Sequence, residues 1–342
     1  MKYSKLTYYL LAILCLMATS CVSDGVMDGC PDNNKQELVN DARVNLILSF
    51  AITSTRSITS EGVEKERNIK DIHIYAFQQD HFIEEVKYIL ISGSNGDATR
   101  RIEGRLSATY DSSQGLELVV VANAEDKGVN SIDLTKVNNK NDLYQQLVFN
   151  YDGSEVWQEN IPMSGVCNID KIKEGYNTGE LTLTRAVAKV NVTVNEGHGI
   201  DNFQINEIKL CNYNTKGYCT SSKIDEPNIP NGTTQSKSPI SSGTLTEIEG
   251  NAYENHFYIP EHQNVGVNKE QKVYLEINAT VKGIAKNYTL AFTQNDNPHN
   301  VLRNYLYVFN IRSVKMEVNV EPTLEYEVKL WEEKTVNIPS FN

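Results

Sequence analysis

Apolar and polar residues alternate along most of this chain, and the alternation changes phase in the stretch from Leu181 to Asn195 (LTLTRAVAKVNVTVN). Its apolar residues occupy odd positions up to Val187 and even positions from Val190 onward. Successive side chains of a β-strand point to opposite faces, so this slip moves the buried side chains to the other face. A strand that bulges, or that passes from one sheet into the next, accommodates such a slip. We therefore predict a junction between two β domains here; the alternative is one long, kinked strand within a single domain.

The first strongly alternating segment, residues 43–52 (RVNLILSFAI), predicts a half-buried strand. The residues expected on its buried face are Val44, Leu46, Leu48, Phe50 and Ile52. A polar segment that contains Arg56 follows. Further short runs predict strands at residues 72–77, 86–91, 101–110 and 116–122, separated by turn sequences such as GSNGD and DSSQG. One short helix is expected in residues 139–149, with Asn141 or Asp142 as its cap.

The second half of the chain is expected to contain more strands around a long polar insert. These strands are predicted at residues 203–211, 256–259, 273–281, 286–292, 305–311, 314–320 and 324–338. The insert, residues 220–243, is rich in Ser, Thr, Pro and Asn, which is typical of a mobile loop or a contact surface. The linker between the domains is expected at about residues 175–181, in the Gly- and Asn-bearing turn EGYNTG, and the second domain is expected to begin near Leu181.

Composition agrees with an all-β chain of two domains. A length of 342 residues is too great for one typical domain, and 18 tyrosines with recurrent Val, Ile and Thr favour strands. The net charge is -12 and the sequence pI is near 5.1, so no stripe of basic side chains is expected that could neutralise the phosphates of a nucleic acid. The chain is therefore not expected to bind nucleic acid.

The N-terminus reads as a signal peptide over residues 1–20. Two lysines precede a twelve-residue apolar run, Leu6 to Met17, and the small residues Ala18, Thr19 and Ser20 stand directly before Cys21. This run is too short for a membrane span. The arrangement resembles the lipobox of bacterial lipoproteins, which implies lipidation of Cys21; ordinary secretion, with Cys21 free or disulfide-bonded, is the alternative. Export also permits disulfides.

Four cysteines remain after the signal peptide and Cys21, and two of them form a candidate disulfide. Cys211 and Cys219 flank NYNTKGY, a turn-like segment that would let neighbouring strands be cross-linked. No CxxC or paired histidine accompanies the cysteines, so no zinc site is expected.

No sequence motif predicts an enzyme. The chain has no GxSxG elbow, P-loop or dinucleotide fingerprint, and its carboxylates are scattered. A metal site formed by His256, His262 and Glu261 can be imagined, but these residues lack the helical spacing of zinc hydrolases. We therefore expect no catalytic residue, no metal and no cofactor.

Seven motifs, in this order and spacing over nearly the whole chain, resemble the Bacteroidales fimbrillin family, the FimA-like subunits of type V pili. They are the lipobox-like Cys21, the strand ending in Thr55-Arg56, IPMSG (161–165), LTRAVAKVNV (183–192), FYIPE (257–261), RNYLYVFNI (303–311) and VKLWEEKTVNI (328–338). The insert at 220–243 matches nothing in the family pattern.

The resemblance implies two tandem β-sandwich domains, transthyretin-like with Greek-key connections and few short helices. It implies a lipidated propeptide at residues 21–56 with a removable first strand, an N-terminal sandwich at 57–180 and a C-terminal sandwich at 181–342. An arginine-specific protease would cut after Arg56, release the strand of Val44 to Ile52, and open a groove for a strand from a neighbouring subunit.

The donated element is expected near the C-terminus, at about residues 324–342. Two alternating runs lie there: Tyr326, Val328 and Leu330, then Val336 and Ile338. The alternative is that both are ordinary closing strands of the second domain.

The expected function is that of a structural subunit of a cell-surface fimbria that supports adhesion. Its partners would be further fimbrial subunits, the arginine-specific protease, the outer membrane before maturation, and a host or bacterial receptor. The alternative is an outer-membrane lipoprotein that binds glycans or host proteins without polymerising, through exposed Trp157, Trp331 and tyrosines.

Overall fold

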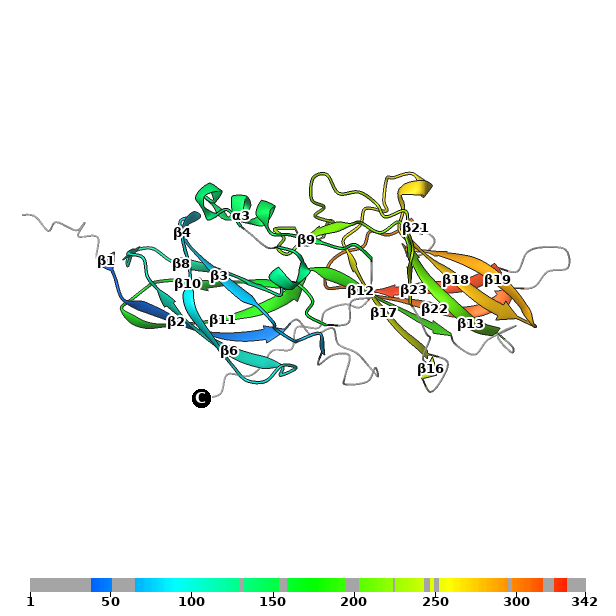
Figure 1. Ribbon diagram of the computed structural model, residues 1–342, viewed down its shortest axis with the longest axis horizontal. Helices are drawn as coiled ribbons and strands as arrows, with labels where there is room; N and C mark the ends of the chain where they lie inside the picture. The colour runs from blue at the N-terminus through cyan, green and yellow to red at the C-terminus, as the bar shows by residue number, and fades with distance from the viewer. Residues whose placement is uncertain are drawn as a thin grey trace, which may run out of the picture. The chain divides into compact units, whose positions relative to one another are not determined.

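A computed structural model describes most of the chain (Figure 1). The described residues are 38–50, 65–129, 132–153, 159–194, 203–223, 225–242, 247–248, 252–294, 297–315 and 323–330. All of these described residues belong to one compact unit. Nearly every described element is a β-strand, which confirms the predicted all-β class.

The first half of the chain forms an eight-stranded sheet in the order β4-β3-β8-β10-β11-β2-β6-β5. Its strands are β2 (Ala42–Phe50), β3 (Ile72–Gln78), β4 (His81–Glu85), β5 (Lys87–Ser92), β6 (Thr99–Leu106), β8 (Leu116–Ala122), β10 (Met163–Ile169) and β11 (Gly175–Arg185). Two short strands, β1 (Leu38–Val39) and β7 (Tyr110–Asp111), pair with each other.

This eight-stranded sheet acts as two layers of a sandwich. β10 and β11 are joined by only two residue pairs, Met163 with Arg185 and Ser164 with Thr184. One apolar core holds side chains from strands on both sides of that join, such as Leu46 on β2 and Leu118 on β8. Alternation along each strand therefore buries one face between the layers and leaves the other face outward.

The second half contributes two further sheets and a second core. A five-stranded sheet has the order β16-β17-β12-β22-β23, and a four-stranded sheet has the order β15-β13-β18-β19. Their strands are β12 (Val187–Val194), β13 (Phe203–Cys211), β15 (Ile240–Ser241), β16 (Glu247–Ile248), β17 (Ala252–Pro260), β18 (Tyr274–Val281), β19 (Ile284–Ala291), β22 (Leu306–Lys315) and β23 (Thr323–Leu330). A small β20 (Thr293–Gln294) and β21 (Asn297–Pro298) pair beside them.

The phase slip in the sequence marks a change of sheet. β11 ends at Arg185 in the first sheet, β12 begins at Val187 in the five-stranded sheet, and only Ala186 separates them. The prediction of a turn in the sequence EGYNTG is wrong, because β11 starts at Gly175 and pairs with β2 over nine residues. That partner lies more than a hundred residues away in sequence, so local turn chemistry could not reveal it.

The helices are short and cover strand surfaces. The predicted helix is α3 (Lys140–Gln146), and its cap is Asn139 rather than Asn141 or Asp142. Asn139 accepts from the Asp142 amide while the Asp142 carboxylate accepts from the Asn139 amide, a capping box. The 3-10 turns are η1 (Glu125–Lys127), η2 (Leu134–Lys136) and η3 (Lys269–Gln271).

Two short strands from opposite halves pair with each other. β9 (Val148–Asn150) runs antiparallel to β14 (Lys216–Tyr218). The core of the second half also includes Leu143, Leu147 and Phe149, which lie on α3 or directly after it. Backbone pairing and apolar packing therefore both join the two halves within the compact unit.

Candidate functional site

The predicted removable strand, β2, lies inside the first sheet and not at its edge. It pairs in parallel with β11 and antiparallel with β6, so both of its backbone edges are occupied. Neither neighbour follows or precedes β2 directly in sequence. Among the described residues, the next strand is β3, which begins at Ile72. A break between Phe50 and Ile72 would therefore detach β2 from the remaining described strands without cutting any of them.

The alternating residues of β2 form part of the core. Val44, Leu46 and Leu48 are fully buried and Phe50 is 4% exposed, whereas Ile47 on the other face is 40% exposed. Ile52, the last residue predicted for this face, lies outside the described residues. Burying four such side chains contributes about 6 to 12 kcal/mol.

Glycines on both neighbouring strands make room for β2. Gly104 of β6 stands opposite Val44, and a Cβ there would lie 3.3 Å from a Val44 methyl group and 2.7 Å from one of Val86. Gly179 of β11 stands opposite Leu46, and a Cβ there would lie 3.3 Å from a Leu46 methyl group and collide with the Cys167 sulfur. A glycine inside a strand often marks such a close approach, a signal that the sequence already carried.

A buried ionic cluster holds the chain shortly after the predicted cleavage site. The Glu66 carboxylate is 2% exposed and lies 2.5 Å from the Lys189 ammonium and 3.3 Å from the Arg185 guanidinium. The Tyr258 hydroxyl donates to it at 2.6 Å. Burial alone would raise the pKa of Glu66, but the two cations and the hydrogen bonds hold it below its usual range. No local sequence pattern reveals this cluster, because its members come from three distant segments: Glu66, the pair Arg185 and Lys189, and Tyr258.

The predicted donor strand is partly integrated into its own sandwich. Tyr326 lies on β23, stacks on Phe309 and bonds through its hydroxyl to the amide and carbonyl of Ala291. Val328 pairs with Phe309 and Leu330 with Tyr307 along β22. Val336 and Ile338 lie outside the described residues, as do Cys21 and Arg56.

The candidate disulfide between Cys211 and Cys219 is not formed: both residues are free, buried thiols. The segment between them does not turn back on itself. Cys211 ends β13 opposite Tyr274, whereas β14 carries Cys219 toward the first half, where its amide bonds to the Leu147 carbonyl. Ser164 also donates to the Cys219 carbonyl, at 2.9 Å.

The described part of the polar insert is packed onto the body. Backbone amides of Thr215 and Ser236 bond to the carbonyls of Thr234 and Tyr213, and the Asn228 amide bonds to the Glu261 carboxylate. Glu261 also forms a buried ion pair with Arg303, with carboxylate oxygen to guanidinium distances of 2.7 and 3.0 Å. Glu261 therefore has a structural partner in place of the imagined metal.

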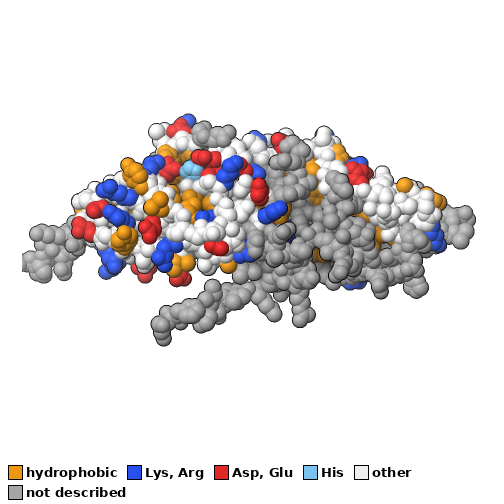
Figure 2. Space-filling model, turned by 60° about the horizontal axis from the view of Figure 1, so that its bottom comes forward, with side chains coloured by type: hydrophobic (Ala, Val, Ile, Leu, Met, Phe, Trp, Pro, Cys, Tyr) orange, Lys and Arg blue, Asp and Glu red, His pale blue; other side chains and the backbone are white. Residues whose placement is uncertain are grey.

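The described residues present no group of three His, Cys, Asp or Glu side chains arranged to hold a metal ion. Within the same residues, none of the helices is long and apolar enough to span a membrane. Figure 2 shows charged and apolar side chains interspersed over the visible part of the first sandwich, without one broad apolar patch. The candidate site that the described residues support is therefore the buried position of β2 between β11 and β6.

Comparison with known proteins relates this arrangement to fimbriae. Residues 27–337 match the model of the family described as fimbrillin-A associated anchor proteins Mfa1 and Mfa2. A search of curated proteins found no significant match.

Solved structures share the fold at low identity. A fimbrial assembly protein from Parabacteroides distasonis superposes with a TM-score of 0.53 at 15% identity, covering 86% of this chain and 100% of that one. A fimbrilin (FimA) from Porphyromonas gingivalis superposes with a TM-score of 0.51 at 16% identity, covering 85% and 98%. These likenesses support the tandem-sandwich fold.

Proposed function

Because this chain belongs to the family of fimbrillin-A associated anchor proteins Mfa1 and Mfa2, and is therefore a fimbrial subunit or anchor protein, we propose that it joins a neighbouring subunit by exchange of strand β2. The observation that carries this proposal is the position of β2 between β6 and β11. Its removal would expose two unpaired backbone edges and an apolar groove, which an incoming alternating strand refills.

The proposed route begins with export as a lipoprotein acylated at Cys21 and continues with cleavage after Arg56. Cleavage at Arg43 would leave the Val44 to Phe50 strand attached to the body, and Arg67 lies beyond the residue that anchors the chain, Glu66. Arg56 precedes Glu66 by ten residues. The buried contacts of Glu66 with Arg185 and Lys189 support the proposal, because they would keep the new N-terminus on the body after β2 leaves.

The proposed donor is the C-terminal segment of another subunit. If that subunit is a second copy, residues 331–342 span about 40 Å when extended, enough to replace nine residues of β2, about 30 Å. Val336 and Ile338 would enter the groove. The earlier run of Tyr326, Val328 and Leu330 cannot enter together with them, because Glu332 and Lys334 fall on the same face between the two runs.

The small number of apolar residues in the proposed donor favours a second candidate function, that of an anchor that keeps its own β2. Burial of Val336 and Ile338 would contribute about 3 to 6 kcal/mol. This is roughly half of what the four buried residues of β2 provide. Retention has a further consequence, because a lipid on Cys21 can tether the body only while residues 21–56 stay attached. The two functions are therefore exclusive for any one molecule.

Two variants test the exchange proposal in cells. Arg56→Ala should accumulate as an uncleaved, unpolymerised lipoprotein, whereas Arg43→Ala, a control on the exposed face of β2, should be cleaved normally. Deletion of residues 331–342 should stop chain growth. Heat-resistant ladders on gels are the readout; ladders from both Arg56→Ala and the deletion would exclude strand exchange.

The lipid is tested separately. Labelled palmitate should enter the wild-type chain and not Cys21→Ala. Equal labelling of both would refute lipidation at Cys21 and leave the strand-exchange proposal to its own test.

A further inference from the structure

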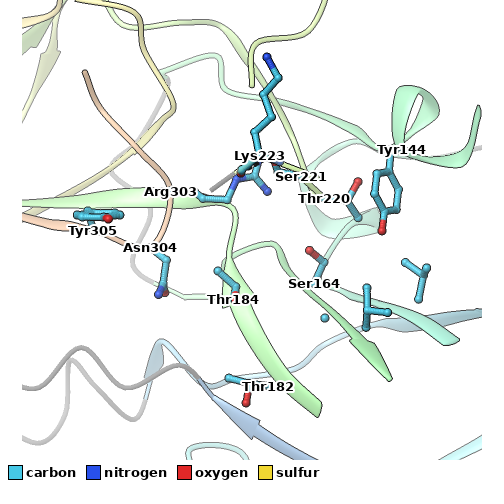
Figure 3. Close-up of a pocket in the computed structure, with 13 residues that line it drawn as sticks. Tyr144, Ser164, Thr182, Thr184, Thr220, Ser221, Lys223, Arg303, Asn304 and Tyr305 are labelled. Carbon is cyan, nitrogen blue, oxygen red and sulfur yellow. Dashed lines mark hydrogen bonds between the residues drawn. The ribbon is translucent and has the colours of Figure 1, made fainter. Parts of the chain in front are cut away.

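A cavity of about 370 Å³ lies beside the short join between β10 and β11, and residues of the second half line its other side (Figure 3). Its floor is formed by the buried residues Val119, Thr220, Arg303 and Asn304, and its rim includes the exposed residues Val166, Thr182 and Lys223. This volume falls within the range of small-molecule sites in proteins.

The walls of the cavity are held in place by main-chain and ionic contacts. β10 approaches β11 so closely at Gly165 that a Cβ there would lie 2.5 Å from the Thr182 carbonyl oxygen. On the opposite wall, Arg303 is fixed by Glu261 and by the carbonyls of Tyr218 and Cys219. The cavity is therefore shaped before any ligand enters.

Hydroxyl groups dominate the polar lining. The Thr220 side chain is 2% exposed, and its hydroxyl has no hydrogen-bond partner. A buried hydroxyl without a partner destabilises the folded protein, so its presence here needs an explanation. Tyr144 and Thr184 also line the cavity, and their side-chain hydroxyls make no hydrogen bond to another described residue.

Tyr144 can act as a donor at neutral pH. Burial, together with the nearby carboxylates of Glu117 and Asp80, raises the pKa of Tyr144 to about 12. Figure 3 shows its ring on one side of the cavity and the ring of Tyr305 at the other side. Two aromatic faces with several hydroxyls between them suit a ligand that is itself rich in hydroxyls and has apolar C–H faces.

The charges near the cavity do not favour an ionic ligand. No carboxylate lines it, and the charge of Arg303 is balanced by Glu261. The Lys223 ammonium lies 3.3 Å from Glu226 in solvent, and in Figure 3 it points away from the hydroxyl groups. A neutral, polar ligand therefore matches the lining better than an anion or a cation.

We propose that this cavity binds a neutral sugar unit, with Thr220, Thr184 and Tyr144 as hydrogen-bonding partners and the rings of Tyr144 and Tyr305 as contact surfaces. Such a site would give a fimbrial protein a means of attachment that does not depend on how the subunits assemble.

The test uses the chain from residue 22 onward as a monomer, with glucose, galactose, mannose, fucose and N-acetylglucosamine as separate probes in ligand-observed NMR. At least one sugar should bind. Thr220→Val and Tyr144→Phe should each weaken its binding by roughly 2- to 12-fold, the effect of one lost hydrogen bond. The matched controls are Thr289→Val on the exposed face of β19 and Tyr88→Phe, whose side chain is 81% exposed; both should bind as wild type does.

Thr220→Val also separates binding from folding. Because its hydroxyl has no partner, the substitution should leave the Tm of the free protein unchanged or higher. The proposal would be overturned if none of the five sugars bound at about 10 mM, a concentration at which a ligand with a millimolar Kd would be detected. Binding that persists unchanged in both Thr220→Val and Tyr144→Phe would also overturn it, and neither outcome depends on strand exchange.

Discussion

At the scale of single residues, His262 makes the fold sensitive to mild acid. Burial lowers the pKa of His262 to about 4 from its usual 6.5. Between pH 6.5 and pH 4, the imidazole of His262 is therefore protonated in the unfolded chain and neutral in the folded chain. The contribution of His262 to the free energy of unfolding is fully present above about pH 6.5. It decreases by about 3 kcal/mol as the pH falls toward 4.

Urea unfolding measured from pH 7 to pH 4 tests this expectation. His262→Gln, which cannot titrate, should flatten the dependence in this window even if it lowers stability overall. An unchanged pH slope in His262→Gln would assign the acid sensitivity to other groups.

Glu66 titrates in a different range, because its pKa is held below that of a free glutamate by Arg185 and Lys189 against the effect of burial. Its contribution is present above about pH 4.5 and is lost at more acidic pH. Glu66→Gln should cost about 3 to 5 kcal/mol near neutral pH, since it leaves two cations in a buried site without their counter-ion.

The control for Glu66→Gln is Glu226→Gln, which removes an exposed surface pair with Lys223. Its effect should stay within about 0 to 1 kcal/mol. Equal unfolding free energies for the two variants would contradict the role assigned to the buried cluster.

At the scale of elements, the glycines beside β2 provide a direct test of how that strand is seated. Gly179→Ala would place a methyl group against Leu46 and Cys167, so we expect a loss of about 1 to 3 kcal/mol. Amide hydrogen exchange within residues 42–50 should become faster. Thr178→Ala, an exposed position next to it on β11, should change neither quantity.

If the amides of residues 42–50 exchanged hydrogen at the same rate in Gly179→Ala and in the wild type, the sheet would tolerate the added methyl group. The close fit of β2 against β11 would then not be what holds the strand.

Individual elements were largely readable from sequence. The alternation in residues 43–52 predicted β2 because one face of that strand is buried, and the phase slip near Ala186 predicted a change of sheet. β10 was missed, because IPMSGVCNI has no clean alternation. The separate strands expected at 305–311 and 314–320 merge, because β22 continues to Lys315 through a bulge near Ile311.

The partners of these elements were not readable from sequence. Val44 pairs with Asn177 and with Gly104, contacts that link three distant segments and leave no local pattern. Glu66 stands in a charged stretch, EKERN, that is typical of a solvated turn. It is buried only because Arg185, Lys189 and Tyr258 meet it there.

At the scale of the whole molecule, the position of β2 connects the fold to the two candidate functions. With the proposed lipid on Cys21, a chain that exchanged β2 would give up the lipid and gain a link to a neighbour, whereas a chain that retained β2 would keep the lipid and could hold a fimbria at the membrane. Both use the same sandwich, so the difference between them is a single peptide bond in the segment between Phe50 and Ile72.

The N-terminus of the assembled protein is the most direct measurement of the central claim, that β2 is exchanged. Fimbriae sheared from cells are purified, and the intact mass and N-terminal sequence of this chain within them are determined. Strand exchange predicts a chain that begins at Ser57 and lacks residues 38–50. An assembled chain that still carries residues 21–56, with a lipid on Cys21, would contradict it.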